Sequence, residues 1–310
     1  MAGGQERILR RRIKSVQSTK KITRAMELIA ASRIVKAQAR VFAASPYAEG
    51  ITAVVRDLQA AGAGSTSPML TPRESIRRVA QVVITADRGL CGGYNTGVMR
   101  AAEAEVREHS ALGREYALYC IGRKSEGYFR FREYAIEASF TGFSDNPSYE
   151  DARAVADAVV GPFERGEIDL VQLIYTRFAS AGRQEVVVRP LLPLDREGFA
   201  APATSAEPAG PSAGYEFEPA PETILDALLP RYAEARVFAA LLNAAASEHA
   251  FRQRAMKAAT DNADELIRTL SRIMNRARQD AITTEIMEIV GGAEALASTG
   301  AADNDRLPTD

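Results

Sequence analysis

Apolar residues recur with helical spacing at both ends of the chain. Between residues 256 and 277 they are separated alternately by three and four positions, at Met256, Ala259, Ala263, Leu266, Leu270, Ile273 and Ala277. This spacing is typical of a coiled-coil seam, so we expect a long helix over 222–296, seventy residues of which would span roughly 105 Å. The first sixty residues predict a second long helix, which Pro46 kinks or breaks by removing an internal hydrogen bond.

The middle of the chain alternates between strand-like and helix-like segments. Runs of apolar and β-branched residues predict strands over 79–86, 116–121, 135–140, 169–178 and 184–194. Helical periodicity predicts helices over 96–109, 124–132 and 149–165. This alternation indicates a partly parallel sheet, and Pro190 and Pro193 favour an edge position for the last strand. We therefore expect a Rossmann-like α/β domain over 75–196.

The remaining segments are connections and ends. Residues 61–72 predict a linker, 197–221 a flexible tether rich in Pro, Ala and Gly, and 297–310 a disordered tail. Pro230 predicts a bend in the C-terminal helix or a later start of it. The apolar faces of the two terminal helices, 1–60 and 222–296, need a partner in water. The expected fold class is therefore α/β, with a long antiparallel coiled coil of N- and C-terminal helices and an inserted α/β domain.

Positive charge is concentrated near the start of the chain. The 310 residues have a formal net charge of −1, yet residues 7–40 hold eleven Lys and Arg against Glu27 alone. Such a basic arm indicates an acidic partner: nucleic acid, an anionic membrane or an acidic protein surface. Apolar residues run through the arm and favour a protein neighbour. A nucleic-acid-binding coiled coil, with salt-sensitive binding, stays an alternative.

The turn TADRGLCGGYN, residues 85–95, joins a predicted strand to a predicted helix. A Gly-rich turn in this position can hold phosphate on its main-chain N–H groups, and this reading leads to a Rossmann-like enzyme as a second alternative. The segment lacks the lysine and the Ser/Thr of a P-loop and is not GxGxxG. The other readings are a tight turn needing glycine for close approach and a loop that docks a partner through Asp87 and Arg88.

No residue set predicts catalysis or metal binding. The two histidines, His109 and His249, lie on different predicted helices without a cluster of ligands. Cys91 and Cys120 predict reduced thiols rather than a disulfide framework. The start of the chain has no apolar core like that of a signal peptide, and we expect no membrane-spanning segment.

Three segments resemble the gamma subunit of rotary F-type ATP synthases. They are IKSVQSTKKITRAMELIAASRIVKAQ at 13–38, ITADRGLCGGYN at 84–95, and MKAATDNADELI with NRARQDAITTEIMEIVGGAEAL within 256–296. They stand in the order and spacing of that family. The resemblance implies a non-catalytic central shaft that couples rotation of a c-ring to conformational changes of beta subunits, which make ATP from ADP and phosphate. The implied partners are three alpha and three beta subunits, epsilon and the c-ring.

The resemblance also implies roles for single residues. Met26 matches the position facing an acidic lever of beta, with Lys20, Arg33 and Lys36 as basic neighbours. The loop near the same lever is matched by Asp87, Arg88 and Cys91. Upper-shaft positions that meet a beta loop are matched by Arg278, Gln279 and Thr283, and polar positions linked to coupling by Arg252 and Glu288.

The resemblance also implies which ligands this chain lacks and where it is located. No cofactor is expected on this chain, because Mg-ATP and ADP belong to the alpha and beta subunits. The expected location is the cytoplasmic face of the cell membrane, reached through partners, with no contact to nucleic acid. The tether, Pro230 and the tail look unusual for the family, and a brake on reverse hydrolysis is one role we consider for the tether or the tail.

Overall fold

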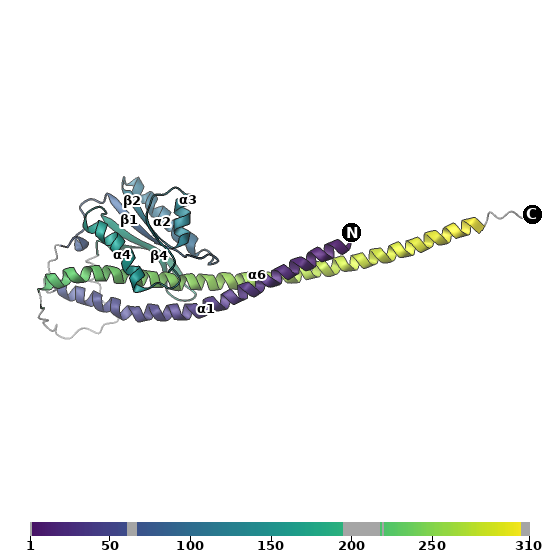
Figure 1. The fold of residues 1–310 in the computed structure, drawn as a ribbon, viewed down its shortest axis with the longest axis horizontal. Coiled ribbons are helices and arrows are strands. Elements are labelled where there is room, and N and C mark those ends of the chain that lie inside the picture. Colours follow the sequence, from purple (N-terminus) through teal and green to yellow (C-terminus); the bar gives the residue numbers. More distant parts are fainter. Residues whose placement is uncertain (1, 61–66, 195–217, 219, 305–310) are drawn as a thin grey trace, which may run out of the picture. The chain divides into compact units, whose positions relative to one another are not determined.

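A computed structural model describes residues 2–60, 67–194, 218 and 220–304. Two long helices, α1 (Ala2–Ala60) and α6 (Pro221–Asn304), pass through two compact units (Figure 1). We call residues 1–26 with 256–310 the terminal unit, and residues 27–255 the central unit. Each unit is considered by itself below. Among the described helices, none has a stretch long and apolar enough to cross a membrane.

Neither internal proline ends its helix. Pro46 lies within α1 and Pro230 within α6, so the predicted break at Pro46 and the predicted later start near Pro230 are wrong. Each proline removes one main-chain hydrogen bond, and nearby side chains compensate by packing: Ile51 and Val55 are buried after Pro46, and Leu229 and Tyr232 flank Pro230 in the core.

The far end of α6 also differs from expectation. The helix continues to Asn304 and so includes residues 297–304 of the predicted tail. Residues 305–310 lie outside the described residues, as do 61–66 of the predicted linker and 197–217 and 219 of the predicted tether.

The central unit contains the expected α/β layer. Five strands, β1 (Arg78–Ile84), β2 (Glu115–Ile121), β3 (Ile136–Phe140), β4 (Leu170–Phe178) and β5 (Gln184–Leu192), form one sheet in the order β3-β2-β1-β4-β5. The first four strands are parallel, and β5 pairs antiparallel with β4 at the edge, as predicted. The connecting segments include α2 (Tyr94–Ala111), α3 (Arg123–Phe131), α4 (Tyr149–Glu164) and the short 3-10 helix η1 (Pro68–Leu70).

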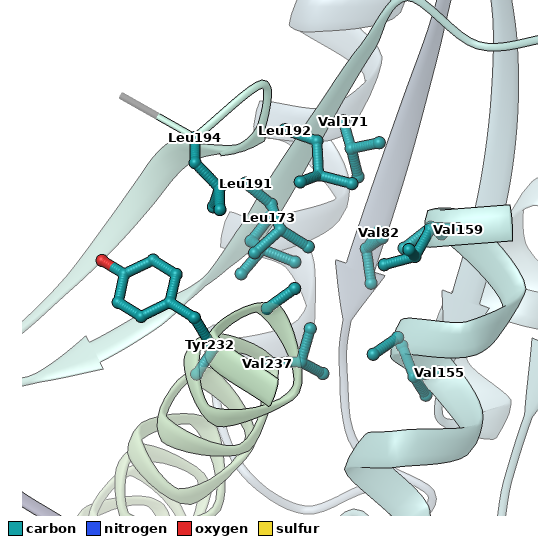
Figure 2. Packing of buried hydrophobic residues seen from close by; sticks show 14 of the residues in the cluster. Val82, Val155, Val159, Val171, Leu173, Leu191, Leu192, Leu194, Tyr232 and Val237 are labelled. Atoms are coloured by element: carbon teal, nitrogen blue, oxygen red, sulfur yellow. The ribbon is translucent and has the colours of Figure 1, made fainter. Parts of the chain in front are cut away.

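Helices cover both faces of this sheet. On one face, Val98 and Val106 of α2 and Phe129 of α3 pack against the strands. On the other, α4 and the early part of α6 pack with the last turns of α1, through residues such as Val159 and Val237 (Figure 2). Strand β1 is buried over six of its seven residues because it lies between neighbours and beneath both helix layers. The sheet therefore holds the loops at the ends of β1 and β3 in fixed positions.

The terminal unit is an antiparallel helix pair. Lys20 of α1 bonds Asp264 of α6, while Thr23, further along α1, bonds Thr260, which is earlier in α6, with 2.8 Å between the hydroxyl oxygens. The residue number on α6 falls as the residue number on α1 rises, so the two helices run in opposite directions, as predicted. Continued at equal rise per residue, this register brings the first turn of α1 opposite α6 near residue 281.

The seam of the pair departs from the prediction at three of its seven positions, where 260, 267 and 274 take the place of 259, 266 and 273. Leu266 and Ile273, predicted in the seam, are 40% and 46% exposed, whereas Thr260 is buried. The seam follows 256, 260, 263, 267, 270, 274 and 277, whose residues are all buried or half-buried. Thr260 fits there because its hydroxyl is bonded to Thr23 and donates to the carbonyl oxygen of Met256, at 2.8 Å. A pattern built from apolar residues alone passes over such a threonine.

Candidate partner-contact surfaces

The carboxylate of Asp87 joins the loop after β1 to the loop after β3. One oxygen accepts hydrogen bonds from the main-chain N–H groups of Gly142, at 2.9 Å, and Ser144, at 3.1 Å, and the other accepts from that of Arg123, at 3.1 Å. In return, the Asp87 N–H donates to the Ser144 hydroxyl at 2.8 Å. Asp87 therefore fixes the position of its neighbour Arg88, whose side chain is exposed.

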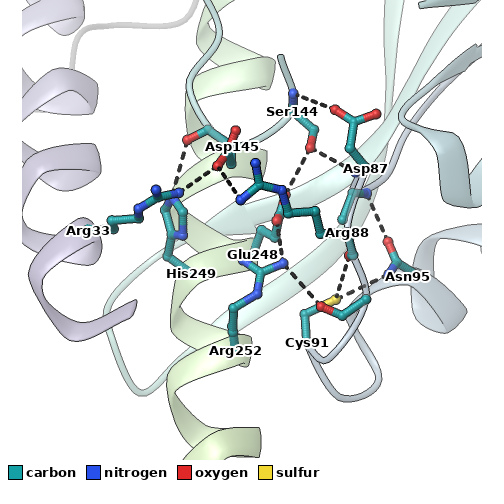
Figure 3. Close-up of polar contacts among 12 residues, drawn as sticks. Arg33, Asp87, Arg88, Cys91, Asn95, Ser144, Asp145, Glu248, His249 and Arg252 are labelled. Atoms are coloured by element: carbon teal, nitrogen blue, oxygen red, sulfur yellow. Dashed lines mark hydrogen bonds and ion pairs between the residues drawn. The ribbon is translucent and has the colours of Figure 1, made fainter. Parts of the chain in front are cut away.

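Behind these loops lies a buried ion pair on α6. Arg252 donates to Glu248 at 2.6 Å, and their side chains are 11% and 1% exposed. The Ser144 hydroxyl also donates to Glu248, at 3.3 Å, and Arg252 reaches the carbonyl oxygen of Gly89 at 3.4 Å. Burial raises the pKa of Glu248, and the nearby Arg252 works in the opposite direction. The pair thus attaches both loops to α6 (Figure 3).

Asp145 connects the same network to α1. Its carboxylate accepts a hydrogen bond from Arg33 at 2.6 Å and lies 4.0 Å from Arg88. Its carbonyl oxygen lies 3.1 Å from Nε2 of His249. A carbonyl only accepts, so Nε2 carries the proton, and burial lowers the pKa of His249, which favours the neutral ring. Figure 3 shows these side chains converging from α1, α6 and the two loops.

The Gly-rich turn is closed on itself. Asn95 accepts from the N–H of Ala86 at 2.9 Å and donates to the sulfur of Cys91 at 3.2 Å. Gly92 has φ +55°, and a Cβ on it would lie 3.6 Å from the Cβ of Ala255 on α6. The N–H groups of Ala86 and Asp87 are thus used within the protein, and the positive φ of Gly92 accounts for a glycine at that position. Nothing in this geometry favours the Rossmann-like enzyme, and the described residues contain no group of three or more His, Cys, Asp or Glu able to hold a metal.

The predicted contact residues of the terminal unit are accessible to different degrees. Lys20 is half-buried in its pair with Asp264, and Met26 is half-buried. Arg278, Gln279, Thr283 and Glu288 are all exposed. They lie on α6 near and beyond residue 281, which is opposite the first turn of α1. Every residue from 282 to 294 is exposed, including Ile282, Ile286 and, at 67%, Ile289.

Five of the six predictions in the central unit come together in one place, while Lys36 is exposed on α1 and lines a cavity with Arg33. Arg33, Asp87, Arg88, Cys91 and Arg252 belong to the network just described, although Cys91 is only 2% exposed and Arg252 is buried. Their contact roles stay predictions.

Sequence reasoning missed four residues of this network, Ser144, Asp145, Glu248 and Asn95, and assigned His249 to no site. For Glu248 the spacing of four from Arg252 is a usable signal for an ion pair on a helix. The loop residues 144 and 145 offer none, because only the sheet topology brings them beside α6.

Comparison with known proteins identifies close relatives. The sequence profile of the family described as ATP synthase matches residues 5–296. The ATP synthase gamma chain of Parafrankia sp. is 54% identical over 300 residues, covering 95% of this chain and 99% of the relative. That of Mycolicibacterium smegmatis is 48% identical over 307 residues, covering 94% and 98%.

Solved structures show the same architecture. A chain of the central stalk/c-ring structure of Tetrahymena thermophila mitochondrial ATP synthase has a TM-score of 0.56 and 26% identity, covering 77% of this chain and 99% of its own. A chain of the OSCP/F1/c-ring structure from Euglena gracilis has a TM-score of 0.64 over 99% of this chain and 98% of its own. At 16% identity, the second likeness concerns the fold alone.

Proposed function

The chain belongs to the gamma-chain family of ATP synthases, and from this premise we propose that it couples rotation of a c-ring to the catalytic cycle of beta subunits. It is a non-catalytic subunit of the central stalk of an F-type ATP synthase. In the proposed mechanism, proton flow turns the c-ring and this chain with it. The chain then drives each beta subunit in turn through its conformations, so that ATP forms from ADP and phosphate.

The observation that carries the proposal is the unpaired end of α6. From residue 282 to 294 every side chain is exposed, and the large apolar residues Ile282, Ile286 and Ile289 are among them. Exposed apolar surface of this kind marks a place where another protein packs. Interspersed with them are the polar positions Thr283 and Glu288. A sleeve of alpha and beta subunits would cover the apolar side chains while polar contacts exchange as the helix turns.

We assign the contacts by the same logic. Lys20, Met26, Arg33 and Lys36 would face an acidic lever of beta, since α1 supplies a local excess of positive charge. Arg278, Gln279 and Thr283 would meet a beta loop, and Glu288 would contribute to coupling.

The loop and its support have separate roles. Arg88, with its exposed side chain, would be the contact point of the loop after β1. Asp87, Cys91 and Arg252 support that loop from within and would act by positioning it.

The proposed assembly has three alpha subunits, three beta subunits, epsilon and a c-ring around one copy of this chain. Nucleotide and Mg²⁺ would bind on alpha and beta and not here. The chain would lie at the cytoplasmic face of the cell membrane, held there by its partners.

A reconstitution experiment tests the proposal. Co-expression with the cognate alpha and beta subunits, followed by native mass spectrometry, should give a complex of three alpha, three beta and one copy of this chain. In the complete enzyme in vesicles, the double variant Arg278→Ala/Gln279→Ala should lower proton-driven ATP synthesis. The matched control is Arg183→Ala, an exposed arginine in the turn between β4 and β5. A chain that ignores alpha and beta would overturn the proposal, and unchanged synthesis in the double variant would overturn the contact assignment.

A further inference from the structure

A positively charged cavity lies within the central unit, between α1, the loop after β3 and α6. Its volume is about 290 Å³, and its polar lining comes from Arg33, Lys36, Arg40, Asp145, Asn146 and His249. Pockets that bind small molecules start at about 300 Å³. The cavity therefore suits a small ligand rather than a nucleotide.

Two of the three cations, Arg33 and Arg40, are set in place before any ligand arrives. Arg33, Lys36 and Arg40 follow each other at spacings of three and four, so they share one face of α1. Arg33 is held by Asp145 at 2.6 Å, and Arg40 is held by the Asn146 side chain and the Pro147 carbonyl. An arginine has five N–H donors, so each keeps some for a ligand.

Lys36 differs from the two arginines. Among the described residues the structure records no hydrogen bond or ion pair for its ammonium group, although the side chain lines the cavity. All three of its N–H donors are thus open to a ligand.

The charges lining the cavity leave an excess of two. Three cations face the single carboxylate of Asp145. His249 adds no charge, because Nε2 donates to the Asp145 carbonyl and burial lowers its pKa. A phosphate group carries about −1.5 to −2 at neutral pH and has several acceptor oxygens. A carboxylate would neutralise only half of the excess.

We propose that this cavity is a binding site for a phosphate dianion, either inorganic phosphate or the phosphoryl group of a small monoester. The ammonium group of Lys36 contacts one phosphate oxygen, and the free N–H groups of Arg33 and Arg40 bind the others. The inference rests on side chains within one unit of this chain and not on the proposed function, which gives Arg33 and Lys36 a different occupant, an acidic lever of beta.

Calorimetric titration of the full-length chain tests the site. Inorganic phosphate should bind with a stoichiometry of one in buffer whose ionic strength is held constant with chloride. Lys36→Gln should weaken binding about tenfold, the effect of losing one charge-assisted hydrogen bond, and Lys36→Arg should retain it. The matched control is Lys124→Gln, which removes one exposed lysine charge from α3 in the same unit and should change nothing. Glycerol phosphate in a parallel titration distinguishes a monoester site, which binds it more tightly, from a site for the free ion.

Several outcomes would overturn the inference. They are an absence of phosphate binding by the unaltered chain, or equal affinities of Lys36→Gln and Lys124→Gln. A circular dichroism spectrum identical to that of the unaltered chain shows that Lys36→Gln is folded, which we expect because this side chain is exposed and has no recorded partner. An acidic peptide tests the other occupant: if the chain binds the peptide but not phosphate, the cavity is a protein-docking surface and the proposal is wrong.

Discussion

Replacing Arg252 with leucine should strongly destabilise the central unit. The guanidinium lies 2.6 Å from the carboxylate of Glu248, whose side chain is 1% exposed. Leucine fills part of the space but leaves the buried carboxylate without its positive partner. Burial already raises the pKa of Glu248, and the loss of Arg252 removes the main influence that opposes this.

The magnitude follows from the burial of both partners. Breaking a buried ion pair from one side costs about 3–5 kcal/mol, and the remaining bond from Ser144 at 3.3 Å is too long to compensate. A domain is typically stable by about 5–15 kcal/mol, so the loss is a large fraction of the whole. In contrast, the double variant Glu248→Gln/Arg252→Leu removes the buried charge and should recover most of this stability.

The chain carries its own reporter for the measurement. It has no tryptophan, and its ten tyrosines all lie between residues 47 and 232, within the central unit. Urea unfolding followed by tyrosine fluorescence therefore reports on this unit alone. Arg183→Leu, on the exposed turn between β4 and β5, is the control for loss of one arginine. A change in unfolding free energy below about 1 kcal/mol for Arg252→Leu, or a double variant no more stable than the single one, would refute the reasoning.

Three further predictions use the same or simpler assays. His249→Gln should reduce the pH dependence of stability. The native pKa of His249 is lowered below 6.5, so the unaltered protein loses stability as the pH falls from 6.5 toward that native pKa. Unfolding midpoints at pH 7.5 and 5.5 test this, and the same change in midpoint for both proteins would contradict it. Gly122→Ala should lower the free energy of unfolding by more than about 2 kcal/mol, since φ is +89° and the new Cβ would lie 2.3 Å from a main-chain oxygen. Gly127→Ala is the control in the same urea assay, and it should leave stability unchanged because its Cβ would meet open space. A double-mutant cycle of Lys20→Ala and Asp264→Ala should give a coupling free energy of only about 0.2–1 kcal/mol by thermal unfolding, because both side chains are over a third exposed. A coupling above about 2 kcal/mol would contradict this prediction and show that the ion pair is shielded from solvent.

The sequence was sufficient for the sheet and the helices because these depend on local pattern. Strand β1 reads as an apolar run from Val79 to Ile84, interrupted only by Gln81, because both of its faces are covered, and Pro190 marks β5 as an edge. The seam of the terminal unit was harder to predict. Its true positions include Thr260, whose hydroxyl is satisfied by the carbonyl oxygen of Met256 and by the hydroxyl of Thr23 on the opposite helix.

The network around Asp145 shows a different limit. Arg33 and His249 meet this residue from positions more than a hundred residues away on either side, through contacts that the sheet topology creates. No periodicity within one segment carries that information. Pro46 and Pro230 show the converse: local rules predicted interruptions, and packing against the core outweighed them.

The burial of both thiols has a practical consequence for site-specific chemistry. Cys91 and Cys120 are buried, and burial raises the pKa of each, to about 12 for Cys120. The thiolate is the reactive form toward maleimides, so at neutral pH both native cysteines are protected from labelling. A cysteine introduced on the exposed end of α6 would therefore be modified selectively by a fluorophore or a bead linker, with both native cysteines left in place.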